Sequence, residues 1–369
     1  MFLKNLILKN FRNYSHLDFN FEKPIVVLVG NNAQGKTNFL ESIYFLASAK
    51  SAKAEKDEEL IFSGNDSLHV KGQLENGDTL EIAMQLVTGR LLKRVKVNGV
   101  GKRVADYSQN LVVVFFTPED INMVSGSPSL RRSHVDQTLS QIDREYKRSL
   151  SQYENIITRK NKVLKSIRDG FAKVDELLFW QDQQVLFGQI LLQKRKDFFN
   201  YLNSVDSEIG SNLGEFEYQY LPNEITIERL HEYQSREIDS ASSLIGPHRD
   251  DFNFLLYPSA TPQDDMKDTQ GRDLSKFGSR GEQRTAVLNL KFLEIFFVEK
   301  VLGARPILLL DDIFSELDDN HRDYVIGISK LQQTIISTVE WDKHLEKEFK
   351  DSANLYYVEN GQISLKDSK

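Results

Sequence analysis

The chain has 369 residues, of which 40% are hydrophobic and 27% are charged, and its formal net charge is −7. This composition is typical of a globular protein long enough for two domains, or for one domain with a large insertion. The absence of cysteine excludes disulfides and thiolate metal sites. Because the overall charge is negative, a nucleic-acid partner would have to be held by a local basic patch.

No stretch is typical of a secretory signal or a membrane span. The N-terminal apolar run is interrupted by Lys4, and the longest apolar runs, 111–116 and 306–310, are too short to cross a bilayer. We therefore expect a cytoplasmic protein without a membrane partner.

The first 29 residues alternate between apolar and polar side chains with a period of two, which predicts strands of a half-buried sheet. Arg12 lies in a polar turn between the first two strands. The pattern leaves two interpretations of this residue open, a solvated turn residue or a functional one.

A glycine-rich segment follows the apolar run 24–29 and precedes a helix expected over 38–49. It has the form G-x-x-x-x-G-K-[ST] of phosphate loops, in which backbone N–H groups and the helix N-terminus bind phosphate oxygens. Lys36 is expected to reach the β- and γ-phosphates of a nucleotide, and the Thr37 hydroxyl to ligate Mg²⁺. The segment consists of Gly30, Asn31, Asn32, Ala33, Gln34, Gly35, Lys36 and Thr37.

Residues 50–65 are polar and predict a loop with a short helix. An antiparallel meander is expected over 66–105, because its strand-like runs are separated by turns that include Asn98-Gly99, a strong hairpin signal. The continuous apolar run 111–116 predicts a central buried strand.

A helical hairpin is the expected structure of the next segment. Apolar residues recur at helical spacing over 127–167 and again over 174–205, with Asp169-Gly170 between them. The other faces of the first helix are rich in Lys and Arg, which either solubilise the arm or lie against nucleic-acid phosphates. Arg131 and Arg132 are candidates for such contacts.

Residues 215–257 predict a strand, a helix over 225–240 and a second strand over 252–257. The turn Gly246-Pro247-His248-Arg249 precedes the second strand. A histidine and an arginine in such a turn are more often structural than catalytic, although loops frequently carry functional sites. A polar loop is expected over 258–276.

A second anion site is indicated by Ser279, an N-cap followed three residues later by Glu282, which together form a capping box at the start of an amphipathic helix. The apolar strand expected at 306–310 ends in two carboxylates. Asp311 is expected to hold the Mg²⁺ shell, and Asp312 to orient or deprotonate the attacking water. The last core strand is expected at 333–338.

With these motifs in place, the sequence resembles the RecF family of bacterial recombination-repair ATPases, which belongs to the broad class of SMC and ABC-type ATPase heads. The resemblance extends almost from end to end, and few families share these motifs in this order. The segments that carry it are Phe11-Arg12-Asn13, Gly30 to Thr37, Thr117-Pro118-Glu119-Asp120, Gly126-Ser127-Pro128, Arg131-Arg132, Gly246 to Arg249, Ser279 to Arg284, Asp311-Asp312 and Ser315 to Asp318.

The resemblance implies an α/β fold, an ABC-type P-loop ATPase head whose mixed sheet is accompanied by an antiparallel meander, with an inserted helical arm. The expected domains are the N-terminal part of the head over 1–120, the arm over 121–240 and the C-terminal part of the head over 241–369.

The resemblance also implies an ATP-dependent homodimer in which Ser279 and Gly281 of one subunit close over the ATP held by the other subunit. Gln283 and Arg12 are expected to contribute to nucleotide binding. Such a dimer would clamp duplex DNA near single-strand gaps or junctions, cooperate with recombination mediators such as RecR, help to load a recombinase and reset by slow, DNA-dependent ATP hydrolysis. The functions implied are DNA repair, recombination and replication-fork restart.

The sequence departs from the ABC pattern at three positions. The second acid after the strand at 306–310 is Asp312, where ABC transporters have a glutamate. No glutamine follows the apolar run 111–116, and Thr338 and Glu340 stand where a switch histidine is usual. These departures predict that the protein hydrolyses ATP slowly and acts as a switch. Two alternatives stay open: the ATPase subunit of a transporter, which the long insertion between Thr37 and Ser279 argues against, and a nucleotide-gated scaffold that does not hydrolyse ATP.

Overall fold

The structure is a computed structural model that describes residues 1–107, 109–205, 213–257 and 271–365. The chain forms two compact units, one made of Met1–Asp120 with Glu294–Lys369 and the other of Ile121–Leu293. The first division falls at 120, where the sequence placed it. The second differs from the expected 240, because the strand that follows residue 250 pairs within the second unit.

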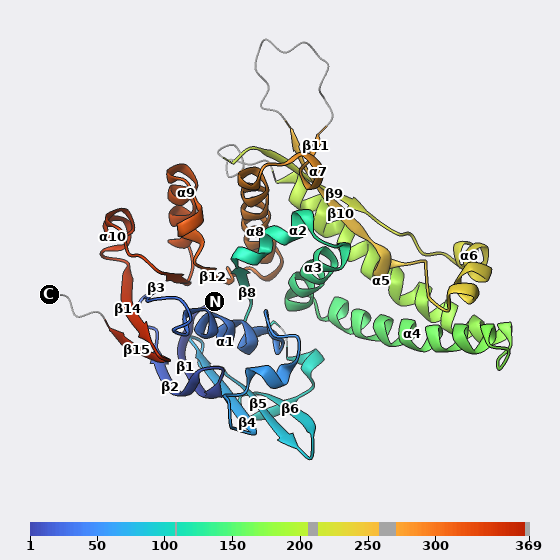
Figure 1. The fold of residues 1–369 in the computed structure, drawn as a ribbon, viewed down its shortest axis with the longest axis horizontal. Coiled ribbons are helices and arrows are strands. Elements are labelled where there is room, and N and C mark those ends of the chain that lie inside the picture. Colours follow the sequence, from blue (N-terminus) through green and yellow to red (C-terminus); the bar gives the residue numbers. More distant parts are fainter. Residues whose placement is uncertain (108, 206–212, 258–270, 366–369) are drawn as a thin grey trace, which may run out of the picture. The chain divides into compact units, whose positions relative to one another are not determined.

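An antiparallel sheet of six strands forms one part of the first unit (Figure 1). The order along this sheet is β2-β1-β4-β5-β6-β7, so the predicted meander is confirmed. Its turn at Asn98 and Gly99 has φ angles of 52° and 75°, the left-handed conformation that a two-residue hairpin requires. The strands are β1 (Leu3–Phe11), β2 (Tyr14–Asn20), β4 (Ser67–Leu74), β5 (Thr79–Val87), β6 (Arg90–Val97) and β7 (Val100–Lys102).

The second sheet of this unit is mixed and has the order β15-β14-β3-β13-β12-β8. All neighbours pair in parallel except β14 and β15. This arrangement confirms the predicted α/β class. The strands are β3 (Ile25–Val29), β8 (Val113–Phe116), β12 (Ile307–Asp311), β13 (Thr334–Thr338), β14 (Ala353–Glu359) and β15 (Gln362–Leu365).

Two details of the predicted sheet were wrong. The apolar run at 111–116 forms β8, which is fully buried but lies at the edge of the sheet, because burial of both faces does not require two neighbouring strands. The chain also continues beyond the strand predicted to be last, through α9 (Asp319–Ser329) and α10 (Lys343–Phe349) to β14 and β15. Strand β14 pairs with β3 and therefore belongs to the core of the sheet.

Helix α1 (Lys36–Ser48) contacts strands of both sheets, and residues from β1, β3, β12 and β13 share its hydrophobic core. The helix thereby fixes the start of its first turn relative to both sheets. The short helices of this unit are η1 (Asp57–Leu60), η2 (Val104–Asp106), η3 (Pro118–Ile121, which crosses into the second unit) and η6 (Ile313–Glu316).

The second unit contains the predicted helical hairpin, formed by α4 (Arg144–Arg168) and α5 (Leu177–Ser204), which pack side by side (Figure 1). The single helix predicted over 127–167 was wrong. It is broken at Asp143, whose Oδ1 accepts a hydrogen bond from the Tyr146 N–H at 2.9 Å and so starts a new helix. The segment before the break forms α2 (Asn122–Ser125) and α3 (Pro128–Ile142).

The rest of this unit is a three-stranded sheet, β11-β10-β9, with helices around it. The loop predicted over 258–276 lies outside the described residues up to 270. The remaining elements are η4 (Val174–Glu176), β9 (Glu215–Leu221), α6 (Ile227–Ser240), η5 (Pro247–Arg249), β10 (Asp251–Tyr257), β11 (Arg272–Asp273), α7 (Leu274–Phe277) and α8 (Arg280–Leu302), which ends in the first unit. Among the helices that the structure describes, none has the length and apolar character needed to cross a bilayer.

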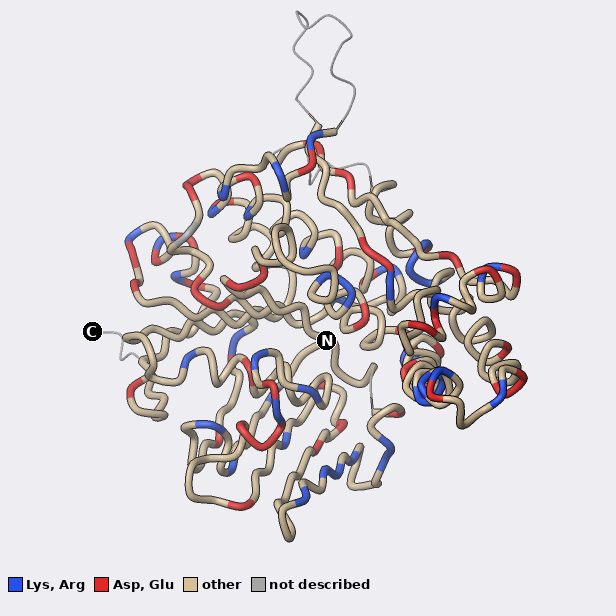
Figure 2. The backbone as a smooth tube through the Cα atoms, turned by 45° about the vertical axis from the view of Figure 1, so that its right-hand side comes forward, with Lys and Arg blue, Asp and Glu red and all other residues tan. Residues whose placement is uncertain are grey.

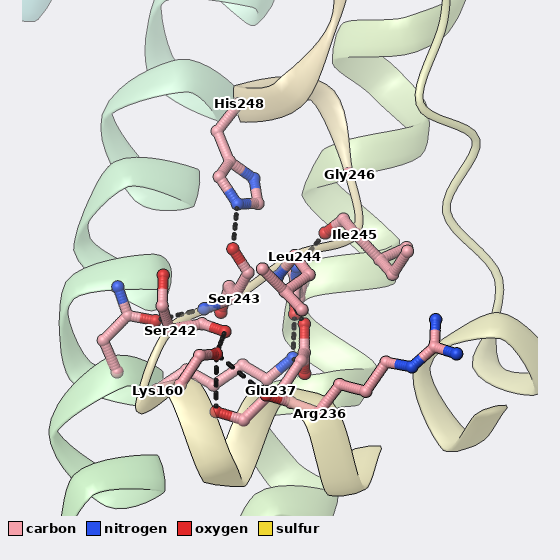
Figure 3. Close-up of polar contacts among 12 residues, drawn as sticks. Lys160, Arg236, Glu237, Ser242, Ser243, Leu244, Ile245, Gly246 and His248 are labelled. Atoms are coloured by element: carbon pink, nitrogen blue, oxygen red, sulfur yellow. Dashed lines mark hydrogen bonds and ion pairs between the residues drawn. The ribbon is translucent and has the colours of Figure 1, made fainter. Parts of the chain in front are cut away.

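A buried polar network joins the helices of this unit (Figure 3). The Lys160 ammonium donates hydrogen bonds of 2.7 Å to both Glu237 Oε2 and Gln184 Oε1, and the side chains of Lys160 and Glu237 are 0% exposed. Glu237 Oε1 also accepts a hydrogen bond from the Leu244 N–H at 2.7 Å. Removal of Lys160 or Glu237 would leave the other charge buried without a partner, which is strongly destabilising. The network therefore holds α4, α5 and α6 together with the loop after α6.

His248 closes the same network as a neutral side chain. Its Nε2 lies 3.0 Å from the Ser243 carbonyl oxygen, a pure acceptor, and its Nδ1 lies 2.8 Å from the Tyr153 hydroxyl. These partners place the proton on Nε2 and leave Nδ1 to accept. Burial lowers the pKa of His248 to about 4, so the imidazole resists protonation in the native state. The structure therefore supports the structural interpretation of this histidine.

We predict that His248 makes the stability of the protein depend on pH. Because its pKa lies below the usual value of about 6.5, its contribution is complete above pH ~6.5 and is lost as the pH falls toward about 4. Relative to His248→Gln, the wild type should lose about 3 kcal/mol of unfolding free energy over that window. Urea unfolding followed by circular dichroism at pH 7, 6, 5 and 4 measures this loss. If the unfolding free energies of the two proteins changed with pH in parallel, the prediction would be contradicted. The control is His16→Gln, because His16 is exposed.

Candidate functional site

The phosphate loop lies between β3 and α1, in the strand-loop-helix context that the motif requires. Gly35 is the N-cap of α1 with a φ of 118°, and because glycine has no side chain the first N–H groups of the helix receive no side-chain cap from it. A Cβ at Gly30 would lie 2.4 Å from the Val358 carbonyl oxygen, and a Cβ at Gly35 would lie 2.5 Å from Asn13 Nδ2. Both glycines are therefore required by close packing.

Two neighbouring segments hold the loop from outside. Asn13 Nδ2 donates to the Gln34 carbonyl oxygen at 3.0 Å, and the Tyr14 hydroxyl donates to the Gly35 carbonyl oxygen at 3.0 Å. From the turn between β14 and β15, the Gly361 N–H also donates to the Gln34 carbonyl oxygen at 3.0 Å. Turning the loop carbonyls outward in this way leaves N–H groups for a ligand inside the loop.

Lys36 lies within the loop and is almost completely buried. Its ammonium donates to the carbonyl oxygens of Gly30 at 2.6 Å and Asn31 at 2.9 Å. Burial lowers its pKa, while the negative charges of Asp312 and Asp311 partly oppose this shift. The lysine is thus held at the mouth of the loop by neutral acceptors.

Asp311, at the end of β12, receives hydrogen bonds from several neighbouring side chains. The Thr37 hydroxyl lies 2.7 Å from Oδ1 and 2.9 Å from Oδ2, and the Ser337 hydroxyl donates to Oδ1 at 2.7 Å. Lys53 Nζ lies 3.3 Å from Oδ2. Strand β13 separates β3 from β12, so the carboxyl ends of three parallel strands bring these groups together.

Asp312 follows with a φ of 51°, a left-handed conformation that is uncommon for a residue other than glycine. Its backbone N–H donates to the Ser337 carbonyl oxygen at 3.0 Å. Its Oδ1 is buried and has no hydrogen-bond partner among the described residues. Burial raises its pKa, Lys36 opposes this shift and Asp311 reinforces it. A buried carboxylate oxygen without a partner next to a phosphate loop is able to accept a hydrogen bond from a ligand or from a water.

These groups line a cleft of about 260 Å³ in the first unit, formed by residues of the phosphate loop together with Lys53, Pro118, Glu119, Asp311 and Asp312. Free N–H groups, a lysine, a hydroxyl and two carboxylates match a nucleotide polyphosphate with Mg²⁺, which usually takes few protein ligands and completes its shell with phosphate and water. The described residues contain no cluster of three or more His, Cys, Asp or Glu able to hold a metal without such a ligand. Thr37 and Asp311 are the residues that would hold it.

The segment Ser279 to Arg284, which we call the signature segment, lies in the second unit and is exposed at Ser279 and Gly281. The predicted capping box is confirmed, since the Ser279 N–H donates to Glu282 Oε2 at 2.7 Å and the Glu282 N–H donates to Ser279 Oγ at 3.3 Å. Apart from its chain neighbours and the backbone of its own helix, no atom of the described residues lies within 4 Å of a Cβ placed on Gly281, so the surface in front of it is open. The Gln283 amide donates to the Leu274 carbonyl oxygen at 2.8 Å and so shapes the turn before α8; its contact with nucleotide stays a prediction.

The structure gives structural partners to two of the candidate arginines. Arg12 donates from Nε to Glu41 Oε2 at 2.8 Å and from Nη2 to Glu41 Oε1 at 3.0 Å, and it does not line the cleft. Arg131 is buried, forms an ion pair with Asp251 at 2.6 Å and donates to the Gly126 carbonyl oxygen at 2.9 Å. Arg131 therefore shapes the base of the arm and has little surface to offer to DNA.

Sequence reasoning missed Lys53, Glu119 and Ser337 as members of the site. Lys53 Nζ lies 3.4 Å from Glu119 Oε1, so it bridges Glu119 and Asp311. Burial opposes the ionisation of Glu119, but its backbone hydrogen bond and Lys53 lower its pKa overall. Only Glu119 carried a signal, since it belongs to the segment Thr117-Pro118-Glu119-Asp120 on which the family resemblance rests. Lys53 lies in a loop of mixed charge without a motif.

Comparisons with known proteins agree with this geometry. Residues 2–364 match the family described as RecF/RecN/SMC N terminal domain. The chain is 35% identical over 376 aligned positions to the DNA replication and repair protein RecF of Agathobacter rectalis, covering 100% of both chains, and 34% identical to that of Bacillus mycoides, covering 98% of both.

Solved structures show the same similarity. The recombination mediator protein RecF with ATPrS, in the RecFOR pathway, superposes with a TM-score of 0.86 at 27% identity, covering 99% of this chain and 98% of that one. An Smc head bound to the C-terminal winged-helix domain of ScpA has a TM-score of 0.52 at 16% identity, covering 99% and 97%, and shows a shared fold alone.

The burial of Asp312 leads to a prediction about stability. Because its pKa is raised, the ionised carboxylate destabilises the native state at neutral pH, and this penalty disappears as the pH falls below the usual Asp value of about 3.9. Asp312→Asn should raise the melting temperature at pH 7 by roughly 1–3 °C, with the difference vanishing near pH 3.5. Thermal unfolding by circular dichroism across this range measures the effect.

The matched control is Asp311→Asn, which has the opposite expected sign. Asp311 accepts hydrogen bonds from Thr37 and Ser337, so its replacement should lower the melting temperature at pH 7. A destabilised Asp312→Asn protein at neutral pH would show that the Asp312 carboxylate is well accommodated, contrary to the prediction.

Proposed function

The chain belongs to the RecF family of DNA replication and repair proteins, within the RecF/RecN/SMC N-terminal domain family, and from this premise we propose that it is an ATP-dependent DNA-binding switch of recombinational repair. ATP with Mg²⁺ binds in the cleft of the first unit. Two chains then associate around the nucleotides and hold duplex DNA near single-strand gaps, where recombination mediators such as RecR assist in loading a recombinase. Slow hydrolysis of ATP resets the protein.

The contact between Thr37 and Asp311 carries this proposal. It joins the phosphate loop to the end of β12, so that one Mg²⁺ ligand from each segment faces the same point of the cleft. Asp312 stands next to them with a carboxylate oxygen that has no partner among the described residues, and this oxygen is suited to orient the attacking water.

The exposed signature segment supports a dimer. A phosphate loop surrounds the phosphates from its own side, and a second anion site with an open surface at Gly281 is most useful to the nucleotide of a neighbouring chain. A two-fold dimer forms two such composite sites, and each bound ATP stabilises the association by linkage.

The exposed face of α4 supports an interaction with DNA. This helix has 25 residues and is therefore about 37 Å long. Six of its eight cations fall within one stripe at the helical period. Lys160 is buried on another face, and Arg168 and the two acids, Glu145 and Glu154, lie outside the stripe. We call this surface the arm stripe; its cations are Arg144, Lys147, Arg148, Arg159, Lys162 and Lys165.

A second basic surface lies on the antiparallel sheet. The exposed residues Arg90, Arg94 and Lys96 alternate along β6 and therefore share one face. Over much of the chain, basic and acidic residues are interspersed (Figure 2). Because the net charge is −7, local basic patches have to supply the attraction to phosphate.

The segment after β8 supports slow hydrolysis. Pro118 and Glu119, which follow the run that lacks the glutamine of the ABC pattern, line the cleft. Glu119 is paired with Lys53, and its carboxylate cannot donate a hydrogen bond to the attacking water as a glutamine amide does, which favours a long-lived ATP state.

We predict that ATP with Mg²⁺ shifts the protein from monomer to dimer. Lys36→Ala removes the charge inside the phosphate loop and should leave the protein monomeric under every nucleotide condition. Size-exclusion chromatography with light scattering, with ATP and with ADP, measures the shift. Ser279→Arg should block closure without preventing ATP binding, because Ser279 is exposed and distant in sequence from the loop. A wild-type protein that stays monomeric with ATP would contradict the dimer.

We also predict that DNA affinity depends on the arm stripe. In Arg144→Gln/Lys162→Gln/Lys165→Gln, the slope of log K against log salt for a gapped duplex should become shallower by about 2–3, since each lost phosphate contact removes about 0.9. Fluorescence anisotropy with ATP between about 50 and about 200 mM salt gives the slope. The control is Lys343→Gln/Lys347→Gln/Lys350→Gln, which removes three exposed cations at α10. An unchanged slope in the stripe variant, or an equal change in the control, would count against this surface.

A further inference from the structure

Lys53 is a second lysine in the nucleotide cleft, in addition to the lysine of the phosphate loop. Its ammonium lies 3.3 Å from Asp311 Oδ2 and 3.4 Å from Glu119 Oε1, and its side chain is 30% exposed. It therefore touches the carboxylate that would hold the metal and a second carboxylate at the rim of the cleft.

The acceptor capacity of Asp311 is already used by its neighbours. An ionised carboxylate offers about four lone-pair positions. Oδ1 receives the hydroxyl of Ser337 and shares the hydroxyl of Thr37 with Oδ2, and Lys53 lies against Oδ2. A divalent cation, or a water of its shell, needs one of these positions.

Among these contacts, that of Lys53 is the easiest to release. It is the longest, at 3.3 Å, whereas those of Thr37 and Ser337 are 2.7 to 2.9 Å. Ser337 lies on the core strand β13 and is 0% exposed. Lys53 also keeps a second carboxylate, Glu119, within reach, so that its charge is not stranded when it leaves Asp311.

The backbone around Lys53 is held in place, so the movement is confined to the side chain. Ser51 Oγ accepts hydrogen bonds from the N–H groups of Lys53 at 3.0 Å and Ala54 at 2.6 Å, and donates to Glu41 Oε1 at 2.5 Å. Glu41 in turn is held by Arg12 at 2.8 Å. Arg12 thus positions the turn that presents Lys53, which gives this arginine an indirect connection to the cleft.

We propose that Lys53 is a positioning residue that competes with the divalent metal for Asp311 and moves to Glu119 and the phosphates when metal-nucleotide binds. This inference rests on the proposed nucleotide site and adds a regulatory role for a residue outside its motifs. The site would therefore prefer metal-nucleotide over the metal alone. A metal ion without nucleotide has to displace Lys53 from Asp311, whereas the negative charge of a bound polyphosphate attracts Lys53 away from Asp311.

The test measures metal binding without nucleotide, so that catalysis is not the readout. Mn²⁺ serves as the probe, and free Mn²⁺ is followed by electron paramagnetic resonance during titration of the full-length protein. Lys53→Met should bind Mn²⁺ about three- to tenfold more tightly than the wild type, because a unit positive charge is removed next to the ligand. Glu119→Gln should bind Mn²⁺ more weakly than the wild type, because Lys53 then has Asp311 as its remaining carboxylate.

The control is Lys50→Met, which removes an exposed lysine three residues away and should leave Mn²⁺ affinity within about twofold of the wild type. Equal affinities of Lys53→Met and wild type, including no detectable binding by either, overturn the proposal. So does an equal gain in Lys50→Met, because that result would reflect general charge and not competition.

A separate titration keeps this proposal distinguishable from the proposed function. Binding of a fluorescent ATP analogue with Mg²⁺ to the wild type tests the nucleotide site itself. Failure of that binding would refute the site, whereas intact binding together with unchanged Mn²⁺ affinity in Lys53→Met would refute the role of Lys53 alone. Glu119→Gln keeps the test available if Lys53→Met does not fold.

Discussion

The hydrogen bond between Thr37 and Asp311 is the interaction on which the first unit depends. It links the phosphate loop after β3 to the end of β12, with β13 between the two strands, and Ser337 of β13 donates to the same carboxylate. The three parallel strands therefore converge on one oxygen pair. This convergence explains why the first turn of α1, which packs against both sheets, presents its N–H groups at a fixed distance from the two carboxylates.

Stability and function are in tension at this point. Asp311 is satisfied by its neighbours, while Asp312, one residue later, has a left-handed backbone and a buried oxygen without a partner among the described residues. Strain of this kind persists where the surrounding structure over-determines it, which is typical of functional sites. In the second unit the buried charges of Lys160 and Glu237 are paired with each other instead, and this pair holds α4 and α6 together.

Local sequence patterns predicted most of the elements. The phosphate loop, the capping box at Ser279 and the strand before Asp311 were recognisable because each depends on neighbouring residues. The break at Asp143 was missed, since the apolar spacing continues across it and only the cap of the second helix interrupts the chain. Strand β14 was missed because its partner β3 lies more than 300 residues away in sequence, and pairing over such a distance leaves no local pattern.

The sequence alone determined the family, the fold class and the motif residues of the nucleotide cleft, because glycine spacing, strand alternation and capping are local properties. The tertiary structure decided what surrounds those motifs. It brought Lys53 to Asp311, gave Arg12 to Glu41 and buried Arg131 against Asp251. These outcomes depend on which side chains meet when distant segments pack, and a charged residue in a polar stretch carries no signal of its future partner.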